Sequence, residues 1–148
     1  MGILDSTLEF SDAQAMAASS AAVTQSTNVH SLGASLKDAW GSAKIPELGG
    51  MYLNLAVSTV VNASTIITAK LMSHTAATSI KSGTQIASIV LPAAAAAGTK
   101  RSVRLPFGQA IGSATTPHIG VTYTVSGAKC TTGAVNCWLG AEPCAVID

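Results

Sequence analysis

The sequence predicts an all-β protein, a jelly roll or two-sheet antiparallel sandwich that follows an N-terminal arm. Residues 52–59 and 118–126 alternate apolar and polar side chains with a period of two and are rich in β-branched residues, which is the pattern of a strand with one buried face. Several weaker segments show the same tendency, and no convincing long helix accompanies them. Short strands of this number in 148 residues fit one domain built from two packed sheets.

Residues 1–26 are expected to form the arm, and residues 27–148 the jelly-roll domain. Ser11 and Asp12 fit the N-cap of a short helix over residues 13–18, because their side chains accept hydrogen bonds from the first helical N–H groups. A stretch rich in Ser, Thr and Ala follows. Arms of this kind pack on their own domain or reach a neighbouring chain. The apolar residues of the arm are therefore candidate contacts with a neighbouring chain, namely Leu4, Leu8 and Phe10.

The expected strands follow one another along residues 27–148 with turn or loop signals between them. Ser82 and Gly83 are a hairpin signal between two of the strands. Longer loops are expected at residues 33–50 and 107–117. The expected strands are 28–32, 52–59, 66–72, 78–81, 84–91, 100–105, 118–126 and 134–139.

Charged residues are scarce in this chain. They make up 10% of it, against about 25% in an average soluble domain. Interface cores are depleted of charge, so the composition favours a protein that buries much of its surface against copies of itself or other proteins. An Ala-rich monomer is the alternative. The net charge of +1 gives no basic excess for nucleic acid.

Neither a membrane segment nor a secretory signal is expected. The longest uncharged stretches are broken by Ser, Thr, Asn, Gly and Pro, and the run of residues 92–98 is far shorter than the roughly 20 apolar residues that span a bilayer. The N-terminal residues lack a basic region followed by an apolar one. Without a signal peptide, the glycosylation sequon that begins at Asn62 is interpreted as a chance match.

The sequence offers no catalytic, cofactor-binding or metal-binding constellation. Its histidines are His30, His74 and His118, each in or beside a strand and without a carboxylate or cysteine at ligand spacing. The motifs of phosphate loops, zinc proteases and nucleophile elbows are absent. We therefore expect no enzymatic activity and no cofactor.

The three cysteines, Cys130, Cys137 and Cys144, are expected to be reduced. An odd number without an export signal favours free thiols, although one disulfide remains open. Their spacing of seven differs from the close pairs of zinc sites. We expect them to pack as small apolar side chains.

Two further features indicate contact surfaces. Lys100, Arg101 and Arg104 form a basic cluster on one strand, which fits a solvated face or a salt bridge between subunits. In strand 134–139, Trp138 lies opposite the apolar face, so it points outward if that face is the core and is buried if the register is shifted. An outward Trp is a common interface anchor. Trp40 in the first long loop is a second candidate anchor.

Several short motifs resemble the capsid cement (decoration) proteins of tailed bacteriophages, of the Bordetella-phage type. The resemblance covers most of the chain in outline. The motifs that carry it are Ile3-Leu4-Asp5, Phe10-Ser11-Asp12-Ala13-Gln14-Ala15, Ser26-Thr27-Asn28-Val29 with Leu32-Gly33, Val103-Arg104-Leu105-Pro106 and Gly120-Val121-Thr122-Tyr123-Thr124-Val125.

The resemblance implies a jelly-roll fold without enzymatic activity. It further implies a homotrimer that binds the major capsid protein on the outer surface of the virion and clamps adjacent subunits after the shell has expanded. Neither nucleic acid nor membrane is an expected partner. The alternative functions are a receptor- or glycan-binding jelly roll of a fibre or lectin, and a small β-sandwich enzyme, which the layout of histidines and acids disfavours.

Overall fold

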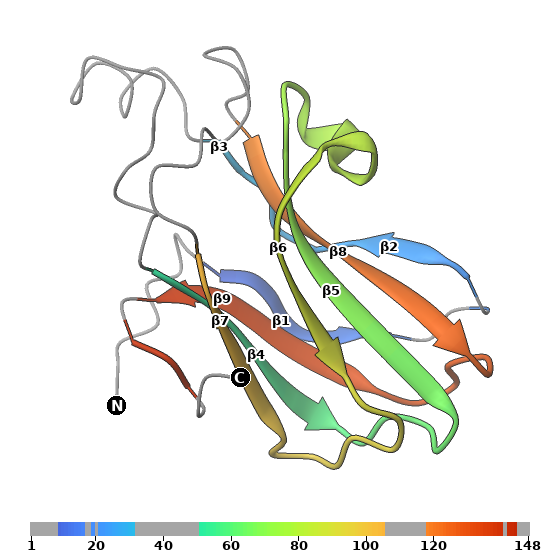
Figure 1. Cartoon of the computed structure of the whole chain (residues 1–148). Helices are drawn as coiled ribbons and strands as arrows, with labels where there is room; N and C mark the ends of the chain where they lie inside the picture. The colour runs from blue at the N-terminus through green and yellow to red at the C-terminus, as the bar shows by residue number, and fades with distance from the viewer. Residues whose placement is uncertain are drawn as a thin grey trace.

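The computed structural model describes residues 9–16, 19, 21–31, 51–105, 118–140 and 142–144. Its strands form two antiparallel sheets that pack face to face as a sandwich (Figure 1). The prediction of an all-β sandwich is therefore confirmed. None of the described residues belongs to a helix that is long and apolar enough to cross a membrane.

Each sheet mixes strands from both halves of the chain. The first sheet has the spatial order β1 (Glu9–Ala15), β9 (Ala134–Gly140), β4 (Tyr52–Thr59) and β7 (Lys100–Arg104). The second has the order β2 (Val23–Gln25), β8 (His118–Gly127), β5 (Thr65–His74) and β6 (Thr84–Leu91), and the short β3 (His30–Ser31) also pairs with β8.

The strand pairs are nested along the sequence. β1 pairs with β9, β2 with β8, β4 with β7, and β5 with β6, all antiparallel. The chain is thus folded like one long hairpin whose two arms are wound together across two sheets, which is the topology of a jelly roll. The jelly-roll prediction agrees with this order.

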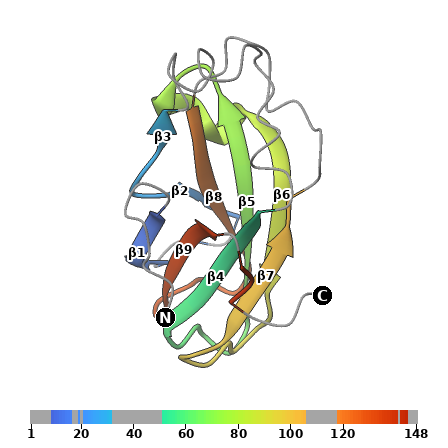
Figure 2. The same ribbon diagram turned by 90° about the vertical axis from the view of Figure 1, so that its left-hand side faces the viewer.

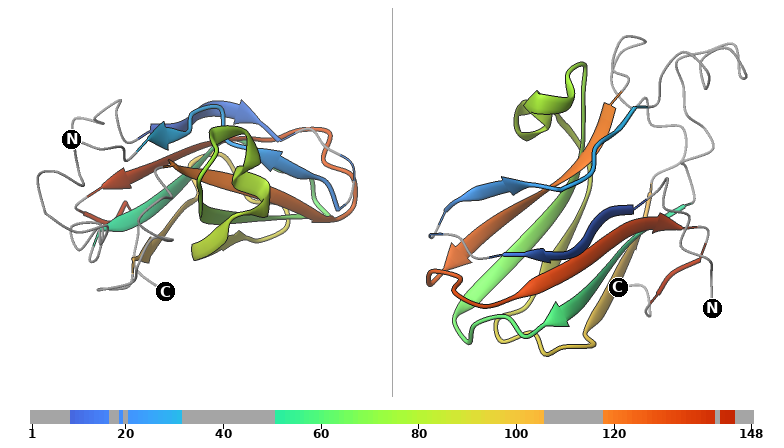
Figure 3. Two further views of the ribbon diagram at one scale, coloured as in Figure 1. Left: turned by 90° about the horizontal axis from the view of Figure 1, so that it is seen from above. Right: turned by 180° about the vertical axis from the view of Figure 1, so that it is seen from behind.

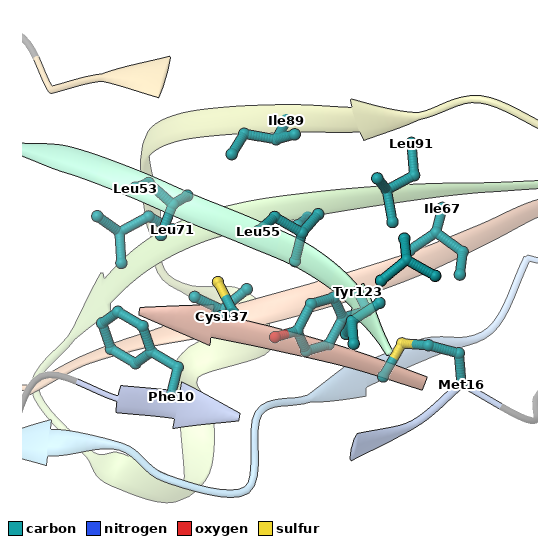
Figure 4. Close-up of a cluster of buried hydrophobic side chains, with 14 of the residues drawn as sticks. Phe10, Met16, Leu53, Leu55, Ile67, Leu71, Ile89, Leu91, Tyr123 and Cys137 are labelled. Atoms are coloured by element: carbon teal, nitrogen blue, oxygen red, sulfur yellow. The ribbon is translucent and has the colours of Figure 1, made fainter. Parts of the chain in front are cut away.

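The core lies between the sheets and is built from the apolar face of each strand (Figure 4). The alternation predicted for β4 and β8 is observed, because every second residue of each strand is buried against the other sheet. The buried residues of these two strands include Leu53, Leu55, Val57, Ile119, Val121, Tyr123 and Val125.

The helix predicted over residues 13–18 is wrong for residues 13–16, and residues 17 and 18 lie outside the described residues. Residues 9–15 form β1, which supplies the outer neighbour of β9, and its Phe10 side chain is fully buried in the core. Burial of a large aromatic side chain outweighs the weak propensity of a single capped turn. The described part of residues 1–26 therefore belongs to the sandwich, with β1 and β2 lying in different sheets (Figure 3).

The strand predicted at residues 78–81 is also wrong, and so is the hairpin at Ser82-Gly83. These residues form a 3-10 helix, η3 (Ala77–Ser82), and β6 pairs with β5 instead. Directly after the helix, the backbone at Gly83 passes so close to β5 that a Cβ atom at this position would lie 2.2 Å from the Ser73 carbonyl oxygen. Glycine is therefore needed here because two backbone segments approach closely, and not because of a two-residue turn.

Candidate functional site

The predicted contact residues fall into different environments. Phe10 is in the core, and Leu4, Leu8 and Trp40 lie outside the described residues. Arg104 and Trp138 share the outer face of the first sheet, while Arg101 registers with the inward-facing Leu55 and so belongs to the opposite face of β7. The basic cluster is thus divided between two faces of one edge strand.

Trp138 points away from the core, as the first of the two register alternatives predicts. Val135, Cys137 and Leu139 of β9 are buried, whereas Asn136 and Trp138 are half-buried on the outer face. A Cβ atom at Gly140 would lie 3.6 Å from the Trp138 Nε1 and 3.1 Å from the Asn54 Nδ2, so the glycine leaves room for both side chains.

Next to Trp138 the outer face of the first sheet is partly covered by residues 142–144. Asn54 and Ser102, both buried, hold this segment. The Asn54 Nδ2 donates to the Glu142 carbonyl oxygen at 3.1 Å, and the Cys144 N–H donates to the Asn54 Oδ1 at 3.0 Å. The Ser102 hydroxyl donates to the same Oδ1 at 2.7 Å. Asn54 is therefore a structural anchor for the segment after β9.

The outer face of the second sheet is wide and poor in charge. One row across all four strands contains Val23, Thr124, Thr68 and Val90 in direct register. Val90 is 55% exposed, and Val23 and Ile66 are each 38% exposed. The next row carries Gln25, Thr122, Lys70 and Ser88, so Lys70 is its one charged side chain. Within these two rows Lys70 is therefore the one charged residue, and the apolar Val23 and Val90 lie on the two edge strands.

The opposite end of this face is closed by the connection between β5 and β6. The η3 side chain of Ile80 is fully buried and packs over Gly120 of β8, where a Cβ atom would lie 3.2 Å from its Cγ2. Met72 on the neighbouring strand is 8% exposed. The exposed part of the outer face is therefore limited to the half that contains the row of Val23 and Val90.

Each histidine is bonded to backbone groups. The His30 Nε2 lies 2.8 Å from the Glu9 carbonyl oxygen, and its ring is tilted against Phe10. The His74 Nδ1 accepts the Ala76 N–H at 3.0 Å, and the His118 Nδ1 lies 3.2 Å from the Thr75 carbonyl oxygen. Within the described residues no group of three or more His, Cys, Asp or Glu side chains is placed to hold a metal ion.

A buried polar link joins the two sheets. The Tyr123 hydroxyl of β8 lies 2.7 Å from the Ser11 Oγ of β1, and the Ser11 hydroxyl donates to the Gln14 Oε1 at 2.6 Å. Gln14 in turn donates through Nε2 to the Gln25 carbonyl oxygen at 2.9 Å and accepts the Thr27 N–H. This chain of bonds fixes the passage from the first sheet to the second.

The cysteines are free thiols in the structure, as predicted. Cys130 and Cys137 are buried, and Cys144 is half-buried on the outer face of the first sheet. Burial raises the pKa of the Cys137 thiol to about 12, so the reactive thiolate is suppressed at neutral pH. Cys137 therefore behaves as a small apolar core residue.

Asn62 of the sequon has a structural task. Its Oδ1 accepts the N–H groups of Thr131 and Thr132 at 3.0 and 2.7 Å, and its Nδ2 donates to the Thr131 Oγ1 at 2.7 Å. The side chain thereby ties the loop before β5 to the loop before β9. Attachment of a glycan to Nδ2 would disrupt this arrangement.

Three features were not predicted from the sequence. These are the anchor at Asn54, the row across the outer face of the second sheet, and the register that places His74 directly opposite His118. All three depend on which strands become neighbours, and period-two patterns within one strand carry no information about its neighbours. No protein-family model matches this chain, and no curated protein shows significant similarity to it.

Proposed function

We propose that this chain is a non-enzymatic structural protein of a bacteriophage virion, a capsid cement protein that binds the assembled major-capsid-protein shell from outside as a trimer. The jelly-roll order of the strands supports the proposal, because it is the fold that the sequence resemblance implies. Catalysis has no part in this function. Binding energy alone performs it.

The observation that carries the proposal is the outer face of the second sheet. Its central row, from Val23 to Val90, presents β-branched and hydroxyl side chains without a charge. Such a surface has no charge to desolvate, and it gains from the removal of apolar area from water. It fits a protein that binds other proteins through the outer face of a sheet.

The energetic role of a cement protein follows from linkage. A protein that binds the assembled shell but not the separated subunits lowers the free energy of the shell by its binding free energy. A trimer that contacts several subunits converts later contacts into intramolecular events, which raises their effective concentration. Individually weak, charge-poor contacts are therefore sufficient.

The test is to mix purified protein with expanded capsids that lack it and to measure bound protein by co-sedimentation. We expect saturable binding of the natural chain. In Thr68→Glu a carboxylate lies at the centre of the proposed contact, so affinity should fall by roughly tenfold or more. Ser58→Glu places the same charge at an exposed position of β4 on the other sheet and is the matched control.

Absence of saturable binding by the natural chain would contradict the proposed function. Equal binding of Thr68→Glu and Ser58→Glu would contradict the assignment of the contact to the outer face of the second sheet. Thermal unfolding of both variants, measured without capsids, separates loss of binding from loss of fold.

A further inference from the structure

The sandwich has four edge strands, and each edge offers backbone N–H and C=O groups that a further strand can bind. In the first sheet the edges are β1 and β7, and in the second they are β2 and β6. Proteins usually protect such edges with bulges, charges or short strands. The four edges of this sandwich differ in how far they are protected.

Three of the edges carry protective features. β1 shows two register shifts against β9 and contains the exposed Asp12. β7 has three cations in five residues, and β2 is only three residues long. None of these strands presents a long regular edge to an incoming chain.

β6 is the exception. Its eight residues contain no charge, no proline and no glycine. A register shift leaves Ile86 as a bulge, but the following residues, Ala87 to Leu91, pair regularly with Leu71 to Ile67 of β5. Among the described residues, β5 is the only strand that pairs with β6. The exposed Val90 lies in this regular half of β6.

The charges beside β6 disfavour a second copy of the same chain as the occupant. β6 and β7 lie on the same side of the sandwich, one in each sheet (Figure 2). Twofold pairing of β6 with β6 of another copy would bring the β7 strands of both copies near each other, each with the exposed Lys100 and Arg104. Like charges that face one another across an interface oppose association. A partner strand with acidic residues beside it complements the same edge.

We propose that the β6 edge binds an extended segment of the shell protein by strand addition. The segment pairs with residues 87–91, is uncharged where it pairs, and carries acidic side chains toward β7. Main-chain hydrogen bonds give this kind of binding its affinity, and the alternate side chains give its specificity. The identity of the partner rests on the proposed function, whereas the location of the contact rests on the sheet edge.

Proline substitution tests the edge. Along β6, the N–H groups point alternately to β5 and to the open edge. Proline removes the N–H group at its position, so one of the variants Ser88→Pro and Ile89→Pro loses a hydrogen bond to β5, and the other loses a donor at the open edge. The variant that keeps the natural melting temperature is the edge variant. We expect its co-sedimentation with expanded capsids to fall by roughly tenfold or more. Alanine at the same position is the matched control and should bind normally.

Amide hydrogen exchange gives a second readout that requires no variant. On capsid binding, the edge-facing amides of residues 87–91 should exchange at least tenfold more slowly, while the exposed Lys129 amide, outside the strands, keeps its rate.

Normal capsid binding by the folded proline variant, or unchanged exchange at residues 87–91 in bound protein, would overturn the edge contact while the proposed function stands. No binding by the natural chain would overturn both. A third outcome would also overturn the proposal. If the edge amides exchange slowly in the free protein, and if the protein has a doubled mass in solution that the proline variant does not have, a second copy occupies β6.

Discussion

Replacement of Phe10 by alanine is expected to destabilise the protein by about 3–5 kcal/mol, as for other buried aromatic side chains. Phe10 is fully buried, and its ring lies 5.0 Å from the His30 ring. The backbone around it also links two segments, because the Phe10 carbonyl oxygen accepts the Asn28 N–H at 2.9 Å. Truncation therefore removes core volume at the point where the N-terminal strands meet the sandwich. Chemical denaturation with urea measures the effect.

Val23→Ala is the matched control for this prediction. Val23 lies in the same N-terminal region but is 38% exposed on an outer face, so its loss should cost less than about 1 kcal/mol. A small effect for Phe10→Ala, comparable with that of Val23→Ala, would contradict the placement of β1 in the core. Deletion of residues 1–8 stops short of β1 and is the truncation that probes Leu4 and Leu8 without removing Phe10.

High pH is expected to destabilise the fold through Cys137 and Tyr123. Burial raises the pKa of Cys137 to about 12, and burial together with the neighbouring Cys137 raises the pKa of Tyr123 well above its ordinary value. Both groups are neutral in the folded state. In the unfolded chain they ionise at their ordinary values, which are 9.0 and 10.0.

The sign follows from proton linkage. Above pH 9 the unfolded state binds fewer protons than the folded state, so the free energy of unfolding falls as pH rises. The stabilisation is complete below pH 9 and is lost as pH approaches 12. For Cys137 the expected loss between pH 8 and pH 11 is about 2–3 kcal/mol.

Cys137→Ala removes this contribution together with the effect of Cys137 on Tyr123. The difference between its pH dependence and that of the natural chain therefore reports the thiol and its coupling to Tyr123. Urea unfolding at pH 8 and pH 11 supplies the comparison. Parallel curves for the two proteins would contradict the burial of a neutral Cys137.

The strand pattern of this protein is largely readable from the sequence. β4 and β8 appear as clean alternations because one face of each is core and the other is not. The same rule left Trp138 outward or buried according to the register, and the buried residues on either side of it in β9 show that it points outward. Period-two patterns succeed here because burial decides the conformation of each strand.

The errors arose where distant contacts decide the structure. Residues 13–15 were expected to begin a helix, but they complete a strand that is needed to cover β9. Residues 78–81 have β-branched and small residues typical of a strand, yet Ile80 is drawn over Gly120 to close one end of the second sheet. Neither partner is near in sequence, so local propensity could not reveal it.

The candidate surfaces were predicted less completely than the fold. Trp138 was found, but the row from Val23 to Val90 combines residues from four strands and becomes visible only with the register. The anchor at Asn54 is similar, because its partners Ser102 and Cys144 follow it by 48 and 90 residues. Sequence patterns describe one strand at a time, whereas a surface belongs to a sheet.

The most direct test of the central claim is the heat stability of the shell. Expanded capsids that lack the protein should be saturated with the purified chain, and their disassembly temperature should be followed by light scattering with and without it. A cement protein raises this temperature in proportion to occupancy, because it binds the assembled shell alone. An unchanged disassembly temperature at full occupancy would contradict a cementing function, and absence of occupancy would contradict capsid binding itself.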